Sequence, residues 1–232
     1  MNGVQVQNAV EMGSLEQERR QSLRVAVLGA GHVGPVIARL AAHAGNSVAV
    51  ATSRDPDEIE LSVQVLSPGA GARWAVDAVA DADIVVLAVP LHRFEQIETS
   101  LVAGKVVVDM MNYWPEVNGR LATFDRRDIS SSEVVARRLP QSRVVKTLNH
   151  LGYHQLDEES RPAGDPERKA LGVAGDDAAA VQVVATFVEG LGFDVVRMGG
   201  LAAGRLLEPD GPVFGRPLGR ADFARAVGAV AR

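Results

Sequence analysis

Three glycines with a fixed spacing are the first residues of this chain whose pattern indicates chemistry. Residues 23–34 read LRVAVLGAGHVG, a short apolar run followed by the spacing G-x-G-x-x-G. The run is typical of a buried parallel strand, and the residues after it are typical of a helix. In such a turn Gly29 permits the tight bend, Gly31 lets the backbone approach a pyrophosphate, and Gly34 lets the helix pack on the strand. The motif therefore predicts a dinucleotide site at the helix N-terminus, with contacts from Gly29, Ala30, Gly31, His32, Val33 and Gly34.

The residues about twenty positions further on select among dinucleotides. A second apolar run starts at Val48 and ends in Thr52, Ser53 and Arg54, where an NAD site typically has an acid for the ribose 2′-hydroxyl. Two hydroxyls and a guanidinium suit a 2′-phosphate, because arginine offers paired donors and no negative charge. The sequence thus favours NADP(H) over NAD(H). Asp55 is an alternative ribose ligand, but the proline and two acidic residues after it favour a helix cap.

Strand and helix patterns alternate along the chain and would position this site. Strands are predicted at 25–28, 48–54, 72–75, 83–89, 105–109, 144–148, 170–174 and 193–197. Helices are predicted at 33–44, 55–66, 76–82, 94–101, 130–139, 177–190 and 221–230. Two long segments, 110–129 and 149–168, are predicted as loops, and loops of that length are often functional. The expected fold is a Rossmann-like, doubly wound α/β fold, with a mostly parallel sheet covered by helices on both faces.

Composition restricts the class of protein. The chain has 232 residues, of which 47% are hydrophobic, enough for one sizeable core. It has no cysteine, which excludes a disulfide framework, a thiolate metal site and a thiol nucleophile. A net charge of -5 argues against a nucleic-acid partner. No run is apolar enough to cross a membrane and no signal peptide pattern is present, so we expect a cytoplasmic protein.

The chain is expected to form one main domain. We predict a disordered tail at 1–22, an NADP-binding Rossmann domain at 23–200, and a small C-terminal extension at 201–232 that packs on the same domain.

Several separated segments then carry a resemblance to a known family. Besides GAGHVG and TSR, they are LAVP (87–90), GKVVVDMMN (104–112), RVVKTLNHLG (143–152), VAGDD (173–177) and GFDVV followed by GGLAAGRLLEP (192–209). Together they resemble the coenzyme F420-dependent NADP oxidoreductase family over about residues 23–209. The resemblance implies a dimer that transfers a hydride between NADP(H) and coenzyme F420, a 5-deazaflavin.

Hydride transfer needs two rings held at contact distance, and positioning supplies much of its catalysis. No protein nucleophile is required, so the important residues are those around the rings. In an open α/β sheet ligands lie at the carboxyl ends of the strands. Further cofactor contacts are expected there from Ala88, Val89 and Pro90. Substrate contacts are expected from Asn112, Asn149, His150, Leu151 and Gly152.

Some of these residues have alternative interpretations. Asn112 and Asn149 could instead cap backbone groups in turns. Tyr113 and Trp114 could form a lid over an aromatic ring, or anchor the long loop in the core.

The two histidines near the end of the sixth predicted strand also allow two interpretations. His150 is a possible proton donor or substrate contact, because imidazole titrates near neutrality. No other catalytic residue is assigned. His150 and His154 could bind a metal at i, i+4 spacing, but no cluster of acids reinforces them, and we predict no metal site.

The second substrate stays open, because residues 111–116, MNYWPE, depart from the T-N-P-like turn of many relatives. Alternatives are an NADPH-dependent reductase of a flavin or of a small carbonyl or imine compound, and a non-enzymatic NADP(H)-sensing module. The partners expected are a small-molecule substrate and a second copy of the chain. An anionic substrate tail could be bound by basic residues of the two long loops, namely Arg126, Arg127, Arg161 and Arg168.

Overall fold

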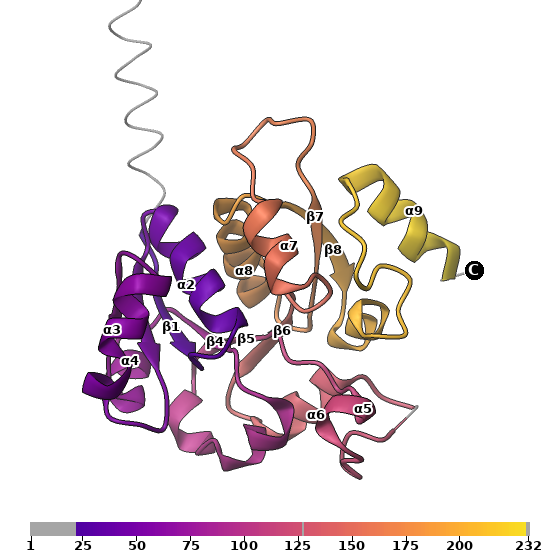
Figure 1. Ribbon diagram of the computed structural model, residues 1–232. Helices are drawn as coiled ribbons and strands as arrows, with labels where there is room; N and C mark the ends of the chain where they lie inside the picture. Colours follow the sequence, from indigo (N-terminus) through magenta and orange to yellow (C-terminus); the bar gives the residue numbers. More distant parts are fainter. Residues whose placement is uncertain (1–21, 127, 231–232) are drawn as a thin grey trace, which may run out of the picture.

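The computed structural model describes residues 22–126 and 128–230, so the predicted tail, apart from Ser22, lies outside the described residues. An eight-stranded sheet with the order β3-β2-β1-β4-β5-β6-β7-β8 runs through the molecule (Figure 1). The strands are β1 Arg24–Leu28, β2 Ser47–Ala51, β3 Ala70–Ala72, β4 Ile84–Leu87, β5 Val106–Asp109, β6 Arg143–Lys146, β7 Ala170–Gly175 and β8 Asp194–Gly199. All neighbouring strands are parallel except β6 and β7, which pair antiparallel. The predicted mostly parallel, Rossmann-like fold is confirmed.

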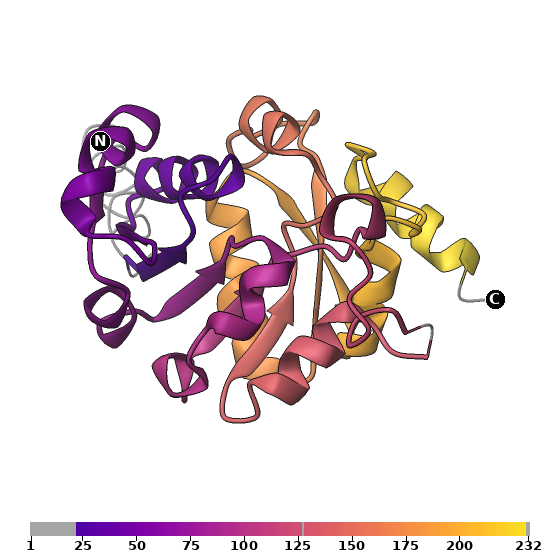
Figure 2. The ribbon, with the colours of Figure 1, turned by 60° about the horizontal axis from the view of Figure 1, so that its bottom comes forward.

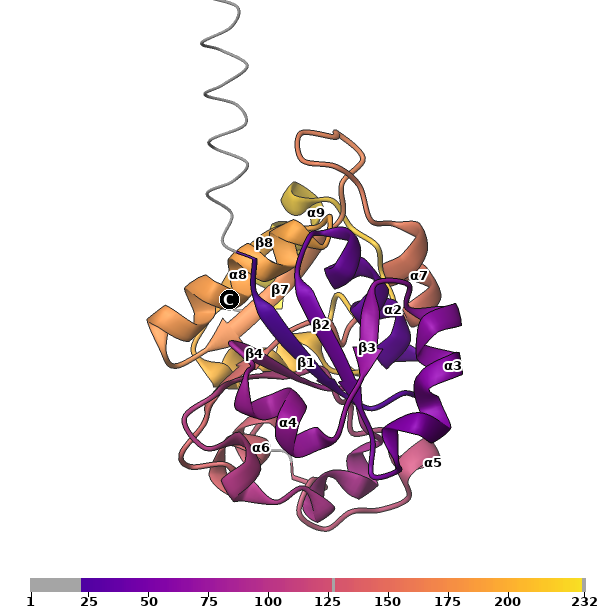
Figure 3. The ribbon, with the colours of Figure 1, turned by 90° about the vertical axis from the view of Figure 1, so that its left-hand side faces the viewer.

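Helices cover both faces of the sheet. The α-helices are α2 Val33–His43, α3 Pro56–Leu66, α4 Ala75–Ala80, α5 Pro115–Asn118, α6 Ser131–Arg138, α7 Tyr153–Glu158, α8 Ala178–Gly190 and α9 Arg220–Val230. Three 3₁₀ segments are η1 Leu91–Gln96, η2 Thr99–Val102 and η3 Leu201–Leu207. Figure 3 shows α2 and α3 on one side of β1 to β3 and α4 on the other, and Figure 2 shows α2 and α6 on opposite sides of the sheet. None of the described helices is long and apolar enough to cross a membrane.

The apolar strands form two core layers, because alternate side chains point to opposite faces. In β1, Val25 and Val27 pack in the layer below α2, α3 and α8, whereas Ala26 and Leu28 pack in the layer below α4 and α6. A strand buried on both faces reads as a continuous apolar run, and this is the pattern seen in the sequence.

Side-chain caps fix where several helices begin. Asp55 caps α3 by accepting a hydrogen bond from the Asp57 amide at 3.0 Å, as expected of a cap rather than of a ribose ligand. Ser130 and Glu133 form a capping box at α6, and Asp177 caps α8. Each cap of this kind contributes about 1 kcal/mol to helix stability.

Several predicted elements were wrong. The predicted strand at 72–75 overlaps β3 only at Ala72, since α4 begins at Ala75, and the predicted loop at 110–129 contains α5. Residues 94–101 form parts of η1 and η2 rather than one α-helix, because Ile97 and Glu98 have extended backbone angles between them. The predicted loop at 149–168 contains α7. Gly152 stands at the N-cap of α7, where its amide donates to the side chain of Gln155 at 3.0 Å, and a glycine there does not weaken the helix.

The C-terminal segment packs against β7 and β8, the two strands beyond the antiparallel pairing. Leu207 of η3, Val213 and Phe223 of α9 form a small apolar cluster with Ala170 of β7. This cluster brings the end of the described chain next to the residues that follow β6.

Candidate functional site

The three glycines of the turn between β1 and α2 occupy different surroundings. Gly29 has a φ of +126°, and a Cβ there would lie 2.2 Å from the carbonyl oxygen of Ala88. A Cβ on Gly34 would lie 1.9 Å from the carbonyl oxygen of Gly29. A Cβ on Gly31 would meet no atom within 4 Å. Gly29 and Gly34 are therefore required by the packing of the protein itself, whereas Gly31 borders open space.

The N-terminus of α2 opens toward this space without a side-chain cap. His32 stands at the N-cap position but makes no capping hydrogen bond, and the first turn contains no acidic residue. Free N–H groups and the positive end of the helix dipole favour an anion at such a position. The His32 ring stacks on Tyr153 of α7 with centroids 5.4 Å apart, and Ala30 and Val33 pack against the core beside them.

The residues after β2 lie beside the turn, because Gly29 donates a hydrogen bond to the Ala51 carbonyl at 2.8 Å. Ser53 and Arg54 are exposed, and the Arg54 amide donates to the Thr52 hydroxyl at 3.1 Å. Among the described residues, no carboxylate forms an ion pair with Arg54. Its guanidinium is therefore available to a phosphate.

The end of β4 contacts the same turn. The Ala88 amide donates to the Leu28 carbonyl at 2.9 Å, and the carbonyl of Ala88 is the group closest to Gly29. Val89 is half-buried and packs on the core, and the exposed Pro90 precedes η1. The three predicted groups of cofactor residues thus lie together at the carboxyl ends of β1, β2 and β4.

Asn112 and Asn149 link the ends of β5 and β6. The Asn112 side-chain amide donates to the Asn149 carbonyl at 2.8 Å. The Asn149 side-chain amide donates to the Asn112 side-chain oxygen at 2.9 Å and to the Leu207 carbonyl at 2.7 Å. Leu148, before this asparagine, has a φ of +63°, a strained conformation for a branched residue. These amides hold the two strand ends, and η3, in one arrangement.

A buried charged pair lies directly behind the two asparagines. The ammonium of Lys146 is 3.3 Å from the carboxylate of Asp109, and both side chains are at most 1% exposed. Lys146 also donates to the Met111 carbonyl, and Asp109 accepts from the Met111 amide at 2.9 Å and from the Ser132 hydroxyl at 2.6 Å. The pair therefore fixes the residue that precedes Asn112.

The apolar pattern of β5 and β6 did not predict this network, because the pattern does not specify where the Lys146 side chain points. The sequence feature that could have indicated the pair is the position of Asp109 and Lys146 at the ends of two strands that become neighbours. The register of β5 and β6 places these two residues side by side.

The structure corrects the prediction for His150. This side chain is fully buried, its ring lies edge-on to Phe223 with centroids 5.4 Å apart, and within the described residues neither ring nitrogen has a hydrogen-bond partner. Burial lowers the pKa of His150 from 6.5 to about 4, so the ring is neutral near neutral pH. A buried, neutral imidazole in this position is a core residue rather than a proton donor.

The next two residues, Leu151 and Gly152, have structural roles in the fold. Leu151 is 5% exposed and belongs to the core, whereas Gly152 is exposed at the N-cap of α7.

The buried His150 predicts a loss of stability in acid. The unfolded chain takes up a proton near pH 6.5 but the folded chain only near pH 4, so stability decreases as pH falls through this window. We expect the free energy of unfolding at pH 5 to be about 2 kcal/mol lower than at pH 7.5 through this group alone. Urea unfolding at both pH values measures it. The variant His150→Leu should lose this part of the pH dependence, whereas a variant of the exposed His92 (His92→Gln) should retain it.

The basic residues of the two long loops do not form one cluster. Arg126 pairs with Asp128 at 2.5 Å. Arg161 donates to carbonyls of its own segment, and Arg168 is buried and donates to the Phe193 carbonyl at 2.6 Å. Arg127 lies outside the described residues. The predicted shared role for these arginines is therefore wrong for Arg161 and Arg168, which stabilise the fold.

The aromatic residues after β5 have different surroundings. The Tyr113 hydroxyl accepts a hydrogen bond from the Leu121 amide at 3.3 Å, and the ring packs near Phe124. Tyr113 thus anchors the long loop. Trp114 is 44% exposed and lies edge-on to Phe214 at 6.0 Å, so it is a surface residue beside the strand ends.

A mostly parallel sheet with a glycine turn before an uncapped helix N-terminus is the arrangement of dinucleotide-binding Rossmann folds. Residues 24–113 match the family model described as "NADP oxidoreductase coenzyme F420-dependent". This match supports the resemblance for residues 24–113, whereas the motifs at 143–209 lie outside the matched residues. Among curated proteins none matches the chain.

Solved structures agree with the family match. A putative F420-dependent NADP reductase from Arthrobacter sp. FB24 is 27% identical with a TM-score of 0.67, covering 90% of this chain and 96% of that one. A hypothetical protein from Sinorhizobium meliloti is 28% identical with a TM-score of 0.66, covering 84% and 95%. A more distant structure, the 3-hydroxyisobutyrate dehydrogenase of Mycobacterium tuberculosis, is 15% identical with a TM-score of 0.55 over 80% and 57%, and it shows only the shared fold.

Proposed function

We propose that this protein transfers a hydride between NADP(H) and a deazaflavin, coenzyme F420. The observation that carries the proposal is the contrast among the three glycines. Gly29 and Gly34 are enclosed by backbone, while Gly31 borders open space at the N-terminus of α2. This open side of the turn leaves room for a pyrophosphate at the helix N-terminus, and the family match supplies the expected identity of the two reactants.

The residues of the site divide into three groups along the strand ends. The turn at Gly31 would bind the pyrophosphate through backbone N–H groups, and Arg54 with its neighbouring hydroxyls would bind the 2′-phosphate. Ala88 and Pro90 would border the nicotinamide, because the β4 end contacts the glycine turn. Bound NADPH would supply the hydride.

The second substrate would lie toward the ends of β5 and β6. Asn112 is half-buried there and its amide is held by Asn149. The protein's contribution is to hold the acceptor ring and to exclude water, since positioning is the main requirement of hydride transfer. Dimer formation, a cytoplasmic location and the domain boundaries remain predictions from the sequence.

The role of Arg54 gives a quantitative expectation. We expect Arg54→Ala to weaken NADPH binding by about 1.5 to 3 kcal/mol, the contribution of a charge-assisted hydrogen bond, and to change NADH binding little. Titration of protein fluorescence with each cofactor measures both affinities. Equal losses for NADPH and NADH would remove Arg54 from the 2′-phosphate site.

The proposed reaction is tested directly by absorbance. Purified protein is mixed with NADPH and oxidised coenzyme F420, and parallel samples contain FMN or FAD. Bleaching of the deazaflavin at a rate well above that of the flavins supports the proposal. Faster reduction of a flavin would identify a flavin reductase, and NADPH binding without reduction of any of the three would contradict F420 as the acceptor.

A further inference from the structure

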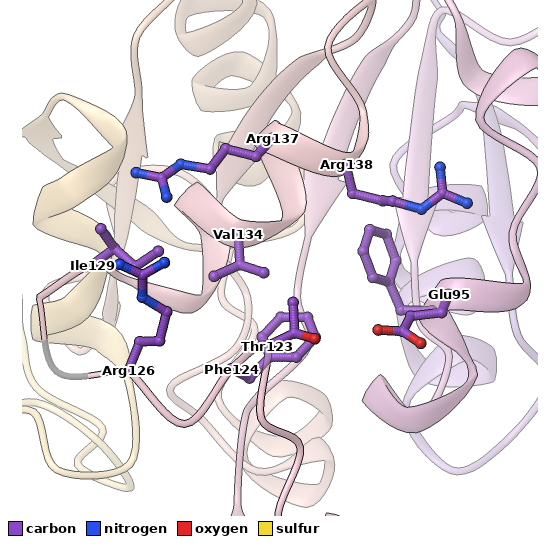
Figure 4. Close-up of a pocket in the computed structure, with 9 residues that line it drawn as sticks. Glu95, Thr123, Phe124, Arg126, Ile129, Val134, Arg137 and Arg138 are labelled. Atoms are coloured by element: carbon purple, nitrogen blue, oxygen red, sulfur yellow. The ribbon is translucent and has the colours of Figure 1, made fainter.

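A cavity of about 270 Å³ lies between the segments that follow β4 and β5 (Figure 4). One wall is η1, the second is the loop before α6, and the third is α6 itself. Its lining residues combine apolar and charged side chains; the charged ones are Glu95, Arg126, Arg137 and Arg138. None of these four belongs to the dinucleotide site described above.

The floor of the cavity is apolar and aromatic. Phe94 and Phe124 meet edge to face with centroids 6.4 Å apart, and they are only 2% and 5% exposed. Val134 of α6 lies beside Phe124 in the close-up, and Ile129 stands at the loop side (Figure 4). A floor of this kind offers an apolar surface to a ring or a short chain.

The rim of the cavity is predominantly positive. Figure 4 shows the guanidinium groups of Arg126 and Arg137 on one side, and Arg138 with Glu95 on the other. Asp128 pairs with Arg126 at 2.5 Å. Among the described residues no carboxylate forms an ion pair with Arg137 or Arg138. Three guanidinium groups thus face two carboxylates.

We propose that this cavity binds an organic phosphate, with its apolar part on Phe124 and Val134 and its phosphate between Arg126 and Arg137. Guanidinium groups form paired, charge-assisted hydrogen bonds with phosphate oxygens, and two arginines from different segments can contact one phosphate from two sides. Asp128 competes with the phosphate for Arg126. The side of the cavity formed by Arg138 and Glu95 is close to neutral, which places the phosphate at the opposite side.

A structural role for Arg137 would not need a ligand. It lies in the last turn of α6, where a cation stabilises the helix dipole. Such a role affects the stability of the helix but gives no binding of a small anion. The two roles are therefore separated by a direct binding measurement.

Phenyl phosphate is a suitable probe, because it joins one aromatic ring to one phosphate. Binding to the full chain is measured by calorimetry, with phenol and inorganic phosphate as partial ligands. We expect saturable binding of phenyl phosphate and weaker binding of either part. Arg137→Ala should weaken binding about tenfold or more, the loss of one charge-assisted contact. Asp128→Asn should strengthen it, because Arg126 loses its competing carboxylate.

Arg220→Ala is the matched control, since this exposed arginine at the start of α9 does not line the cavity. Its affinity should equal that of the unmodified protein, and circular dichroism should show that all three variants are folded. No binding of phenyl phosphate, or equal affinity in the Arg137→Ala and Arg220→Ala variants, would overturn the proposal.

The source of the phosphate is decided by competition. If oxidised coenzyme F420 displaces phenyl phosphate, the cavity binds the phosphate-bearing part of the hydride acceptor. If both bind together, the cavity serves a separate organic phosphate. The binding measurement does not depend on hydride transfer, so a negative absorbance assay would leave this proposal standing.

Discussion

Replacing Lys146 by methionine is expected to lower the free energy of unfolding by about 3 kcal/mol or more, because a buried charge loses its partner. The Asp109 carboxylate would remain fully buried, and its hydrogen-bond donors among the described residues would be the Ser132 hydroxyl and the Met111 amide. Methionine has a similar length and fills the same volume, so the loss reports the charge rather than a cavity. Urea or guanidinium unfolding followed by circular dichroism measures the effect.

A second variant separates the ion pair from local packing. The double variant that combines Asp109→Asn with Lys146→Met removes both charges. Its free energy of unfolding should be higher than that of Lys146→Met alone, since no unpaired buried charge remains. Lys169→Met is the control, because Lys169 forms only a long, partly exposed pair with Glu159 at 3.9 Å and should cost about 1 kcal/mol or less. A Lys146→Met variant as stable as this control would show that the buried pair contributes little.

The substitution Gly31→Val is expected to abolish binding of both NADPH and NADH without unfolding the protein. A Cβ on Gly31 meets no protein atom within 4 Å, so the free protein tolerates a side chain there. The same side chain would occupy the space proposed for the pyrophosphate, which both cofactors share. We expect an affinity loss of at least about 100-fold, which corresponds to about 2.7 kcal/mol.

The neighbouring glycine provides the contrasting case. In Gly34→Ala the new Cβ would lie 1.9 Å from the backbone oxygen of Gly29, so α2 could not keep its position on β1. This variant should lose thermal stability as well as cofactor binding. Unchanged NADPH affinity in Gly31→Val would exclude the glycine turn from the site.

The sequence predicted the parts of the molecule that depend on local patterns. The glycine spacing, the apolar runs and the cap at Asp55 each act within a few residues, and the structure has all of them. No such pattern predicted the antiparallel pairing of β6 and β7. The apolar run of a buried strand does not indicate whether its neighbour is parallel or antiparallel.

The parts of the site that the sequence misplaced depend on contacts between distant segments. His150 has a residue type suited to proton transfer, but Phe223, from α9, covers it. Lys146 has a charge that is unusual in a buried strand, and only the parallel register of β5 and β6 shows its partner Asp109. The charged rim at Arg126 and Arg137 likewise forms only when the loop and α6 fold together.

The burial of Lys146 also makes this side chain a chemical reporter of motion. The 232-residue sequence has three lysines, Lys105, Lys146 and Lys169, so three ε-amino groups can be followed separately by mass spectrometry after acylation. Lys105 and Lys169 are partly accessible, whereas the ammonium of Lys146 is enclosed. An acylating reagent can reach this amine only when the ends of β5 and β6 separate. The labelling rate of Lys146 therefore measures how often these two strand ends, which would border the second substrate, come apart.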